Sequence, residues 1–216
     1  METIYYLNRK CRTRVFENVN GEKTSFKRGN LSFTTIGLVK PAIEAYLKYP
    51  NDKEKRIEYY FNLIDWLCDE VKDQLLERFE FQCEALACQF PFMIKNKLWM
   101  GSENLNSKDK IKEMLKNGTL GISYFGLAEA LKMLIGKHHG ESEEAQELGL
   151  KIIKFMRQHC DDYKQQYHLN FGLFATPAEG LSGKFTKLDR KKYGIIPEVT
   201  DRTYYTNSCH QIRTVA

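Results

Sequence analysis

Cys11 has the surroundings in this 216-residue chain that most favour covalent chemistry at a side chain. Arg9, Lys10 and Arg12 lie within two residues of it, and Arg14 follows. Cations that are close in space lower the pKa of a thiol and make it more reactive. The alternative is an ordinary thiol on a basic, solvated surface, and the spacing alone leaves both interpretations open.

A second candidate site begins at Thr176–Glu179, directly after the apolar run Phe171–Ala175. Proline suits the first position of a helix, where its missing N–H costs nothing, so Pro177 predicts a helix start. The N–H groups at such a start bind anions such as phosphate, and Ser182–Lys184 follow closely. The alternative is a plain capped helix with no ligand.

Patterns that would hold a metal ion are weak. His138 and His139 are adjacent, so they cannot face the same way on a helix, and they favour a polar helix terminus and loop. The six cysteines include no CxxC pair, and the spacing of Cys83 and Cys88 matches no standard zinc site. In a reducing cytosol such sparse cysteines are thiols. We therefore expect no metal site in this chain, and no P-loop, GxGxxG, HExxH or GxSxG motif occurs.

The composition is that of a globular protein, with 42% hydrophobic and 28% charged residues and a formal net charge of +5. No basic run of five or more residues, zinc finger or RNP-type motif occurs, so we expect no nucleic-acid partner. A membrane span needs about 20 apolar residues, and neither such a stretch nor a signal peptide is present. These features predict a cytoplasmic protein without a membrane partner. The basic residues near Cys11, and a second cluster, either are solvated or attract a polyphosphate; that second cluster is Lys184, Lys187, Arg190, Lys191 and Lys192.

Strands alternating with helices must position these residues. Apolar and β-branched content predicts buried strands over 31–36 and 120–126, and a further strand over 171–175. Spacing of three and four residues predicts helices from Pro41 to about Tyr49 and over 53–81, 107–116, 127–135 and 142–163. Cys68 lies on the apolar face of the longest helix and is expected in the core. The order indicates a helix-rich α/β architecture with too few strands for a closed sheet.

Several stretches, taken in chain order, resemble the catalytic subunit of the anaerobic (class III) ribonucleoside-triphosphate reductases, members of the glycyl radical enzyme family. The longest of them reads ATPAEGLSGKFTK, from Ala175 to Lys187. The other matching stretches are Cys11–Val15, Arg28–Ile36, Gly126–Glu129, Ile135–Ser142, Asn170–Phe171, Asp189–Gly194 and Tyr205–Ser208. Single stretches are modestly specific, but together they cover nearly the whole chain in the order of the family.

The resemblance implies part of a ten-stranded α/β barrel, in which residues 1–216 form a single partial domain. It implies that Cys11 is the cysteine that becomes a thiyl radical and takes the 3′ hydrogen of the substrate ribose. The substrate would be a ribonucleoside triphosphate, reduced at the expense of formate to a deoxyribonucleoside triphosphate. The expected substrate-binding residues are Asn30, Thr176, Pro177, Ala178, Glu179, Gly180, Leu181 and Ser182. The family also uses a glycyl radical installed by a radical-SAM activating enzyme, and a zinc site, both expected outside this chain.

Departures from the family pattern bear on activity. Arg9 and Lys10 stand where the family has Met-Gly, and Gly37 stands where it has asparagine. The N-terminal half of the family protein and its glycyl radical segment have no counterpart in the sequence. We therefore expect a fragment or degenerate copy that is inactive alone. The alternatives are one piece of a split reductase, with a second polypeptide carrying the missing barrel half, or a non-catalytic nucleotide-binding or interaction protein.

Overall fold

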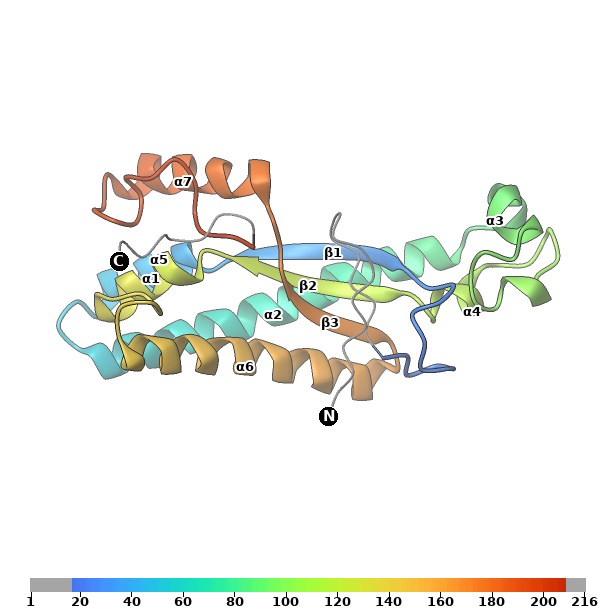
Figure 1. Cartoon of the computed structure of the whole chain (residues 1–216), viewed down its shortest axis with the longest axis horizontal. Helices are drawn as coiled ribbons and strands as arrows, with labels where there is room; N and C mark the ends of the chain where they lie inside the picture. The colour runs from blue at the N-terminus through green and yellow to red at the C-terminus, as the bar shows by residue number, and fades with distance from the viewer. Residues whose placement is uncertain (1–16, 209–216) are drawn as a thin grey trace. The chain divides into compact units, whose positions relative to one another are not determined.

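The computed structural model describes residues 17–208 (Figure 1). Its elements, in chain order, are β1 (Asn30–Gly37), α1 (Val39–Lys48), α2 (Lys53–Cys83), the short 3-10 helix η1 (Ala87–Gln89), α3 (Pro91–Lys95), the short 3-10 helix η2 (Ser102–Asn104), α4 (Lys112–Leu115), β2 (Thr119–Phe125), α5 (Leu127–Ile135), α6 (Glu143–Tyr167), β3 (Asn170–Ala175) and α7 (Glu179–Tyr193).

The three strands form one sheet in the order β1-β2-β3 and run in the same direction (Figure 1). Parallel neighbours need a crossover connection, which is usually helical. Helices α1 and α2 lie between β1 and β2 in the chain, and α5 and α6 lie between β2 and β3. The predicted alternation of strands with helices is therefore confirmed. Among residues 17–208, no helix combines the length and the apolar character that crossing a membrane requires.

The described residues divide into two compact units. Unit 1 comprises residues 17–34, 70–122 and 159–174, and unit 2 comprises residues 35–69, 123–158 and 175–208. The strands and the two long helices pass from one unit into the other, and each unit is described by itself below. The single domain expected over residues 1–216 concerns the whole chain and stays a prediction.

Three buried asparagines tie together the loops of unit 1. Asn18 Nδ2 donates to Asn117 Oδ1 at 2.9 Å, and Asn170 Nδ2 donates to Asn18 Oδ1 at 3.1 Å. The backbone N–H of Val19 donates to Asn170 Oδ1 at 2.8 Å. Because a buried amide is costly without partners, this network holds the bend of the chain at residues 19–21.

The helix predicted over residues 107–116 is wrong for most of its length, since only Lys112–Leu115 is helical. The preceding residues pair with the segment after α2 instead. The N–H groups of Ala87 and Cys88 donate to the carbonyls of Asp109 and Ser107, both at 2.9 Å, and Ile111 N–H donates to Ala85 O at 3.0 Å. These tertiary hydrogen bonds hold residues 107–111 out of the helical conformation that their amphipathic pattern favours.

In the core of unit 2, helices α1 and α5 pack on each other. Their inward side chains, which include Ile43, Leu131 and Leu134, are fully buried. Helix α1 begins at Val39, so Pro41 stands at its third position rather than its first. Gly136 ends α5 at the predicted place, in the left-handed conformation that favours glycine (φ 80°).

Most remaining element predictions are confirmed in type, with shifts at their ends. Helix α2 begins at Lys53 as predicted and runs two residues past Phe81, and Cys68 on it is fully buried. Helix α6 starts after Ser142, whose Oγ accepts the N–H of Ala145 at 3.2 Å, as a capping serine does. Strand β1 extends one residue past the predicted 31–36 at each end. It is only partly buried, with Ile36 its one buried residue, where a buried strand was predicted.

Candidate functional site

The carboxyl ends of β2 and β3 meet one irregular stretch of chain in unit 2. Thr176 N–H donates to Tyr124 O at 3.1 Å, which continues the pairing of the two strands. The stretch Arg202–Ser208 lies across these ends, because Gly126 N–H donates to Thr206 O at 2.7 Å and Ser208 N–H donates to Thr176 O at 3.1 Å. In open parallel sheets ligands bind at the carboxyl ends of the strands, so this place is the candidate site.

Helix α7 begins two residues later than Pro177 predicts. Its first residue is Glu179, and the residue before it, Ala178, has a left-handed backbone (φ 44°, ψ 37°). Such a conformation is strained for alanine and occurs mostly where function or packing demands it. The N–H groups of the first helical turn have no partner within a helix, and they form the positive end of its dipole. The turn beginning at Glu179 can therefore attract an anion.

The residues predicted to bind substrate lie around this turn with different exposure. Thr176 and Ser182 are buried, Pro177 and Leu181 are partly buried, and Gly180 is exposed. Their predicted substrate contacts stay predictions.

Ser182 faces the interior of unit 2 and joins α7 to the Arg202–Ser208 stretch. Its Oγ lies 3.4 Å from Glu179 O, to which it donates, and 3.4 Å from Asn207 Nδ2, from which it accepts. Thr186 Oγ1 donates to the Ser182 carbonyl at 2.8 Å. These contacts make Ser182 an internal fastening of the helix start.

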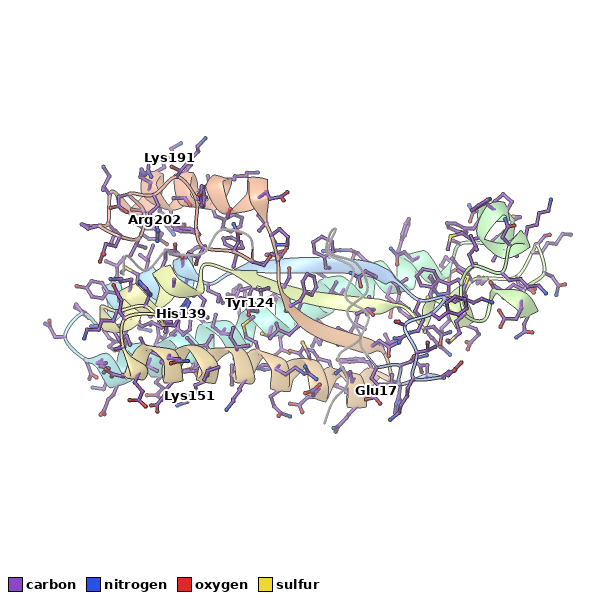
Figure 2. The ribbon with its side chains drawn as sticks, viewed as in Figure 1. Glu17, Tyr124, His139, Lys151, Lys191 and Arg202 are labelled. Atoms are coloured by element: carbon purple, nitrogen blue, oxygen red, sulfur yellow. The ribbon has the colours of Figure 1, made fainter. Side chains whose placement is uncertain are left out.

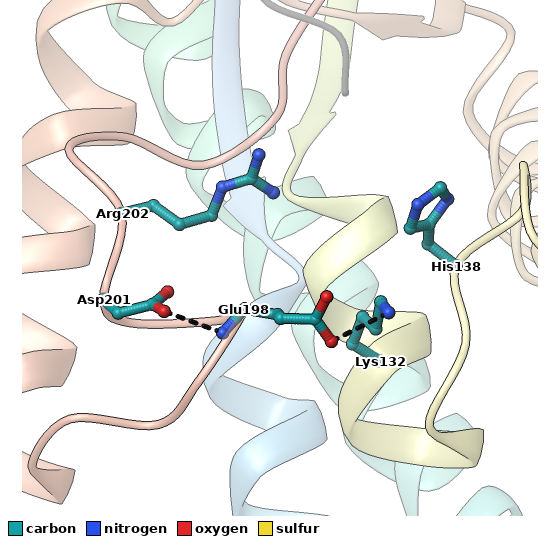
Figure 3. A pocket seen from close by; sticks show the side chains of 5 residues that line it. All are labelled: Lys132, His138, Glu198, Asp201 and Arg202. Atoms are coloured by element: carbon teal, nitrogen blue, oxygen red, sulfur yellow. Dashed lines mark hydrogen bonds and ion pairs between the residues drawn. The ribbon is translucent and has the colours of Figure 1, made fainter. Parts of the chain in front are cut away.

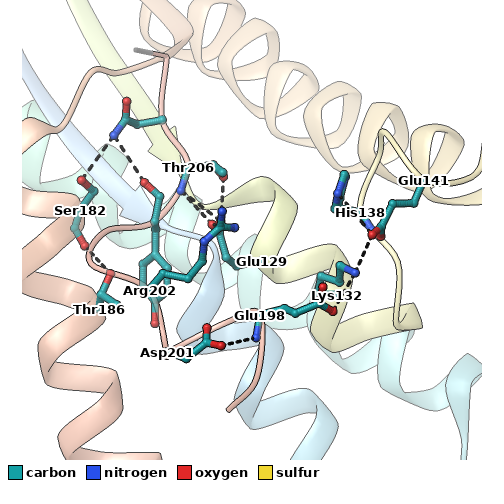
Figure 4. Close-up of polar contacts among 12 residues, drawn as sticks. Glu129, Lys132, His138, Glu141, Ser182, Thr186, Glu198, Asp201, Arg202 and Thr206 are labelled. Atoms are coloured by element: carbon teal, nitrogen blue, oxygen red, sulfur yellow. Dashed lines mark hydrogen bonds and ion pairs between the residues drawn. The ribbon is translucent and has the colours of Figure 1, made fainter. Parts of the chain in front are cut away.

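Glu129 of α5 also anchors the Arg202–Ser208 stretch (Figure 4). Its carboxylate is fully buried and accepts hydrogen bonds from the N–H and hydroxyl of Thr206 and from Arg202. Burial raises the pKa of Glu129, while the donors from Thr206 and Arg202 act in the opposite direction. Sequence reasoning missed this role, although Glu129 and Thr206 both lie in stretches that carry the resemblance.

Two further side chains of α7 hold the same stretch. Asp189 Oδ2 accepts the hydroxyl of Tyr205 at 2.9 Å, and both residues are buried. Burial raises the pKa of Asp189 and of Tyr205. Arg190 donates from Nε to Thr200 O at 2.6 Å and from Nη2 to Arg202 O at 2.5 Å. Arg190 therefore serves the fold rather than a ligand.

The rest of the predicted basic cluster is divided over α7. Lys184 and Lys187 line an open hollow of about 440 Å³ together with residues of the helix start and of the 203–204 loop. Lys191 projects from the exposed face of α7 (Figure 2), and Lys192 Nζ lies 3.5 Å from Glu44 Oε1. Two of the five cations thus lie beside the anion-attracting helix start.

A second hollow of about 280 Å³ lies between α5 and the 198–202 loop (Figure 3). Lys132 Nζ contacts carboxylates of Glu141 at 2.8 Å and Glu198 at 2.9 Å. Burial opposes the charge of Lys132, but the two carboxylates outweigh it and raise its pKa. Arg202 also lines this hollow and is paired with Glu129 at 3.1 Å. Because Lys132 and Arg202 are both paired, the hollow offers an added anion little attraction.

His138 lines that hollow from the loop between α5 and α6, where a polar terminus and loop was predicted. Its side chain is buried, and its Nδ1 accepts the N–H of Gly140 at 3.0 Å. The backbone N–H of His138 donates to Glu141 Oε2 at 2.7 Å. Burial lowers the pKa of His138. Within residues 17–208, no three His, Cys, Asp or Glu side chains are grouped so that they could hold a metal ion.

Two predicted site residues are not among the described residues of unit 2. Cys11 is outside the described residues. Asn30 is the partly buried first residue of β1 and belongs to unit 1, whereas Thr176–Ser182 belong to unit 2. At Gly37 a Cβ atom would lie 3.1 Å from Phe125 Cζ and 3.2 Å from Phe185 Cδ1, so aromatic rings fill the space that an asparagine side chain would need.

Comparison with known proteins decides the family. The model of the family described as anaerobic ribonucleoside-triphosphate reductase matches residues 3–214. The chain belongs to this family. The Escherichia coli anaerobic ribonucleoside-triphosphate reductase is 31% identical over 91% of the chain, and the bacteriophage T4 enzyme is 30% identical over 93% of it. The chain spans 26% and 31% of the lengths of these curated relatives.

Solved structures of reductases share the fold. The Thermotoga maritima anaerobic ribonucleotide reductase with dATP in its specificity site aligns with a TM-score of 0.59 at 18% identity, over 90% of this chain and 29% of that one. The complex of the same enzyme with dATP and CTP aligns at 0.57 and 19% identity, over 91% and 29%. The predicted fold, part of an α/β barrel of the ribonucleotide reductase type, is thereby confirmed.

Proposed function

We propose that this chain supplies part of the catalytic barrel of an anaerobic ribonucleoside-triphosphate reductase, an oxidoreductase of deoxyribonucleotide synthesis. The observation that carries the proposal is the family match over residues 3–214. Because the chain spans about a quarter of its Escherichia coli relative, turnover is proposed for an assembly that also contains the rest of the barrel. Such an assembly includes a polypeptide segment with the remaining strands.

In this proposal Cys11 takes the 3′ hydrogen of the substrate ribose as a thiyl radical, and the 2′ hydroxyl leaves as water. Formate supplies the reducing equivalents. A glycyl radical installed by an activating enzyme supplies the oxidising equivalent that Cys11 needs. Cys11→Ala in the assembled enzyme is expected to abolish deoxyribonucleotide formation under strict anaerobiosis, and unchanged formation would refute the assignment of Cys11.

The Thr176–Ser182 segment is proposed to hold the phosphates of the ribonucleoside triphosphate. Three features of unit 2 support this. The segment leaves the carboxyl end of β3, it leads into the positive end of the α7 dipole, and Lys184 and Lys187 line a hollow beside it. The carboxylate of Glu179 in the first turn opposes anion binding, so we expect the backbone N–H groups and not the side chains of that turn to hold the phosphates.

A pair of variants at Gly180 tests the phosphate contact. A Cβ atom at Gly180 would meet no atom within 4 Å, so either variant fits. Gly180→Glu adds a negative charge to the first turn of α7, and Gly180→Gln adds a similar volume without charge. A like charge at ~4 Å costs about 1 kcal/mol in water, so Gly180→Glu should weaken triphosphate binding by about fivefold relative to Gly180→Gln.

The two variants are compared by titration calorimetry with a ribonucleoside triphosphate and with the matching nucleoside. The nucleoside lacks phosphates, so its affinity should be the same for both variants. A negative side chain stabilises a helix start, which removes instability of Gly180→Glu as an explanation for weaker binding. Equal triphosphate affinity of the two variants would refute phosphate binding at this turn.

A further inference from the structure

Glu129 places a carboxylate in the interior of unit 2, in the first turn of α5, with none of its side chain exposed. Thr206 N–H lies 3.0 Å from Glu129 Oε1 and 3.2 Å from Oε2, and the Thr206 hydroxyl lies 2.7 Å from Oε2. Arg202 Nη1 donates to Oε1 at 3.1 Å. Both oxygens are therefore occupied by donors from one short stretch of chain (Figure 4).

A carboxylate suits this arrangement. The Thr206 N–H and the Arg202 guanidinium can only donate, and the Thr206 hydroxyl is placed to donate to Oε2, so the side chain accepts at both oxygens. An amide of the same shape removes the charge opposite Arg202. Its NH₂ group would either face Arg202 and the Thr206 N–H, which cannot accept, or make the Thr206 hydroxyl turn from donor to acceptor. Because the Glu129 side chain is fully buried, its donors would be left short of an acceptor, and the stretch would shift to find other acceptors.

The stretch that Glu129 holds is fastened to both ends of the proposed phosphate segment. Ser208 N–H, two residues after Thr206, donates to the carbonyl of Thr176 at 3.1 Å. Asn207 Nδ2 donates to Ser182 Oγ at 3.4 Å. A displacement of residues 206–208 therefore reaches the first and the last residue of the Thr176–Ser182 segment.

We propose that Glu129 is a positioning residue, which acts through Thr206–Ser208 to place the Thr176–Ser182 segment against the phosphates of the substrate. The inference rests on the proposed function, because it takes that segment to be the phosphate site. Glu129 itself touches no substrate in this proposal. Its loss should therefore affect ligands in proportion to the phosphates that they carry.

The test uses the full chain with Glu129→Gln, and Glu141→Gln as the matched control. Glu141 is also a carboxylate that accepts a backbone N–H and a cation, but its partners are His138 and Lys132 and not the 202–208 stretch. Dissociation constants are measured for a ribonucleoside triphosphate and for the matching nucleoside. We expect Glu129→Gln to raise the constant for the triphosphate about tenfold and that for the nucleoside less than twofold, and Glu141→Gln to change neither.

Thr206→Val is the second variant, in case Glu129→Gln does not fold. It removes only the hydroxyl that donates to Glu129 Oε2, and it should show the same selective loss at a smaller size, about threefold. Equal weakening of both ligands, or none, in the folded variants would overturn the positioning role while leaving the proposed function intact. A wild-type chain that binds the nucleoside but gains nothing from the phosphates would instead overturn the phosphate site, and the inference with it.

Discussion

The two glycines that flank α5 allow a sharp test of packing in unit 2. Gly126 and Gly136 both have left-handed backbones, with φ of 81° and 80°. They differ in surroundings: a Cβ atom at Gly126 would lie 2.6 Å from Val39 Cγ2, whereas a Cβ atom at Gly136 would meet nothing within 4 Å. Replacing each by alanine thus imposes the same backbone strain but only one collision.

The expected magnitudes follow from these distances. A left-handed conformation costs a residue with a Cβ atom about 1 kcal/mol, which is the whole expected loss for Gly136→Ala. Overpacking a well-filled core adds about 1–3 kcal/mol, so Gly126→Ala should lose about 2–4 kcal/mol. Both losses fall within the typical stability of a domain, about 5–15 kcal/mol, and are measurable in folded protein.

The free energy of unfolding is measured by urea titration of the wild type, of the single variants Gly126→Ala, Gly136→Ala and Val39→Ala, and of the double variant Gly126→Ala/Val39→Ala. Truncating Val39 removes the atom that collides, so the double variant should lose less than the sum of the losses of Gly126→Ala and Val39→Ala. Equal losses for Gly126→Ala and Gly136→Ala, together with strict additivity in the double variant, would refute the packing argument.

Two more perturbations have defined outcomes. Tyr205→Phe removes the hydroxyl that donates to the buried Asp189 at 2.9 Å, and it should lower the free energy of unfolding in urea by about 1–3 kcal/mol. The control Tyr46→Phe, at a site 39% exposed, should change it by less than about 0.5 kcal/mol. Similar losses for the two variants would contradict the importance of the Asp189 contact. The hydrogen bond from Lys132 lowers the pKa of Glu141 below its ordinary 4.5, so this interaction stabilises the fold above that pH and is lost as the pH falls through the lowered pKa. The difference in Tm between wild type and Glu141→Gln should therefore shrink from pH 6 to pH 3, and a difference that is constant over this range would count against the ion pair.

Local patterns predicted the elements whose stability is local. The apolar spacing of residues 53–81 and the glycine at 136 sufficed for α2 and for the end of α5, because periodicity and a left-handed stop act within a few residues. The helix over 107–116 failed because its backbone groups pair with residues 85–88, far away in the chain. Nothing in the amphipathic pattern could reveal that competition.

The candidate site shows the same division. The strand that leads into Thr176 and the helix after it follow from the sequence, but the left-handed Ala178, which delays the helix to Glu179, does not. The fastening of Thr206 by Glu129 joins residues 77 positions apart, and no spacing rule reaches that distance. The matching stretches that contain these two residues were the sole signal, and they indicated family membership rather than a contact.

The asparagine network of unit 1 also bears on how the chain ages chemically. Asn117 is followed by Gly118, and in a flexible chain the unhindered glycine nitrogen attacks the asparagine side-chain carbonyl, closes a succinimide ring and releases ammonia. In the folded unit the N–H of Gly118 donates to Leu115 O at 2.8 Å, and Asn117 Oδ1 accepts from Asn18. Both reacting groups are thus held in other hydrogen bonds in the folded unit. Deamidation at Asn117 is therefore expected only while unit 1 is unfolded, and its extent measures the time spent in that state.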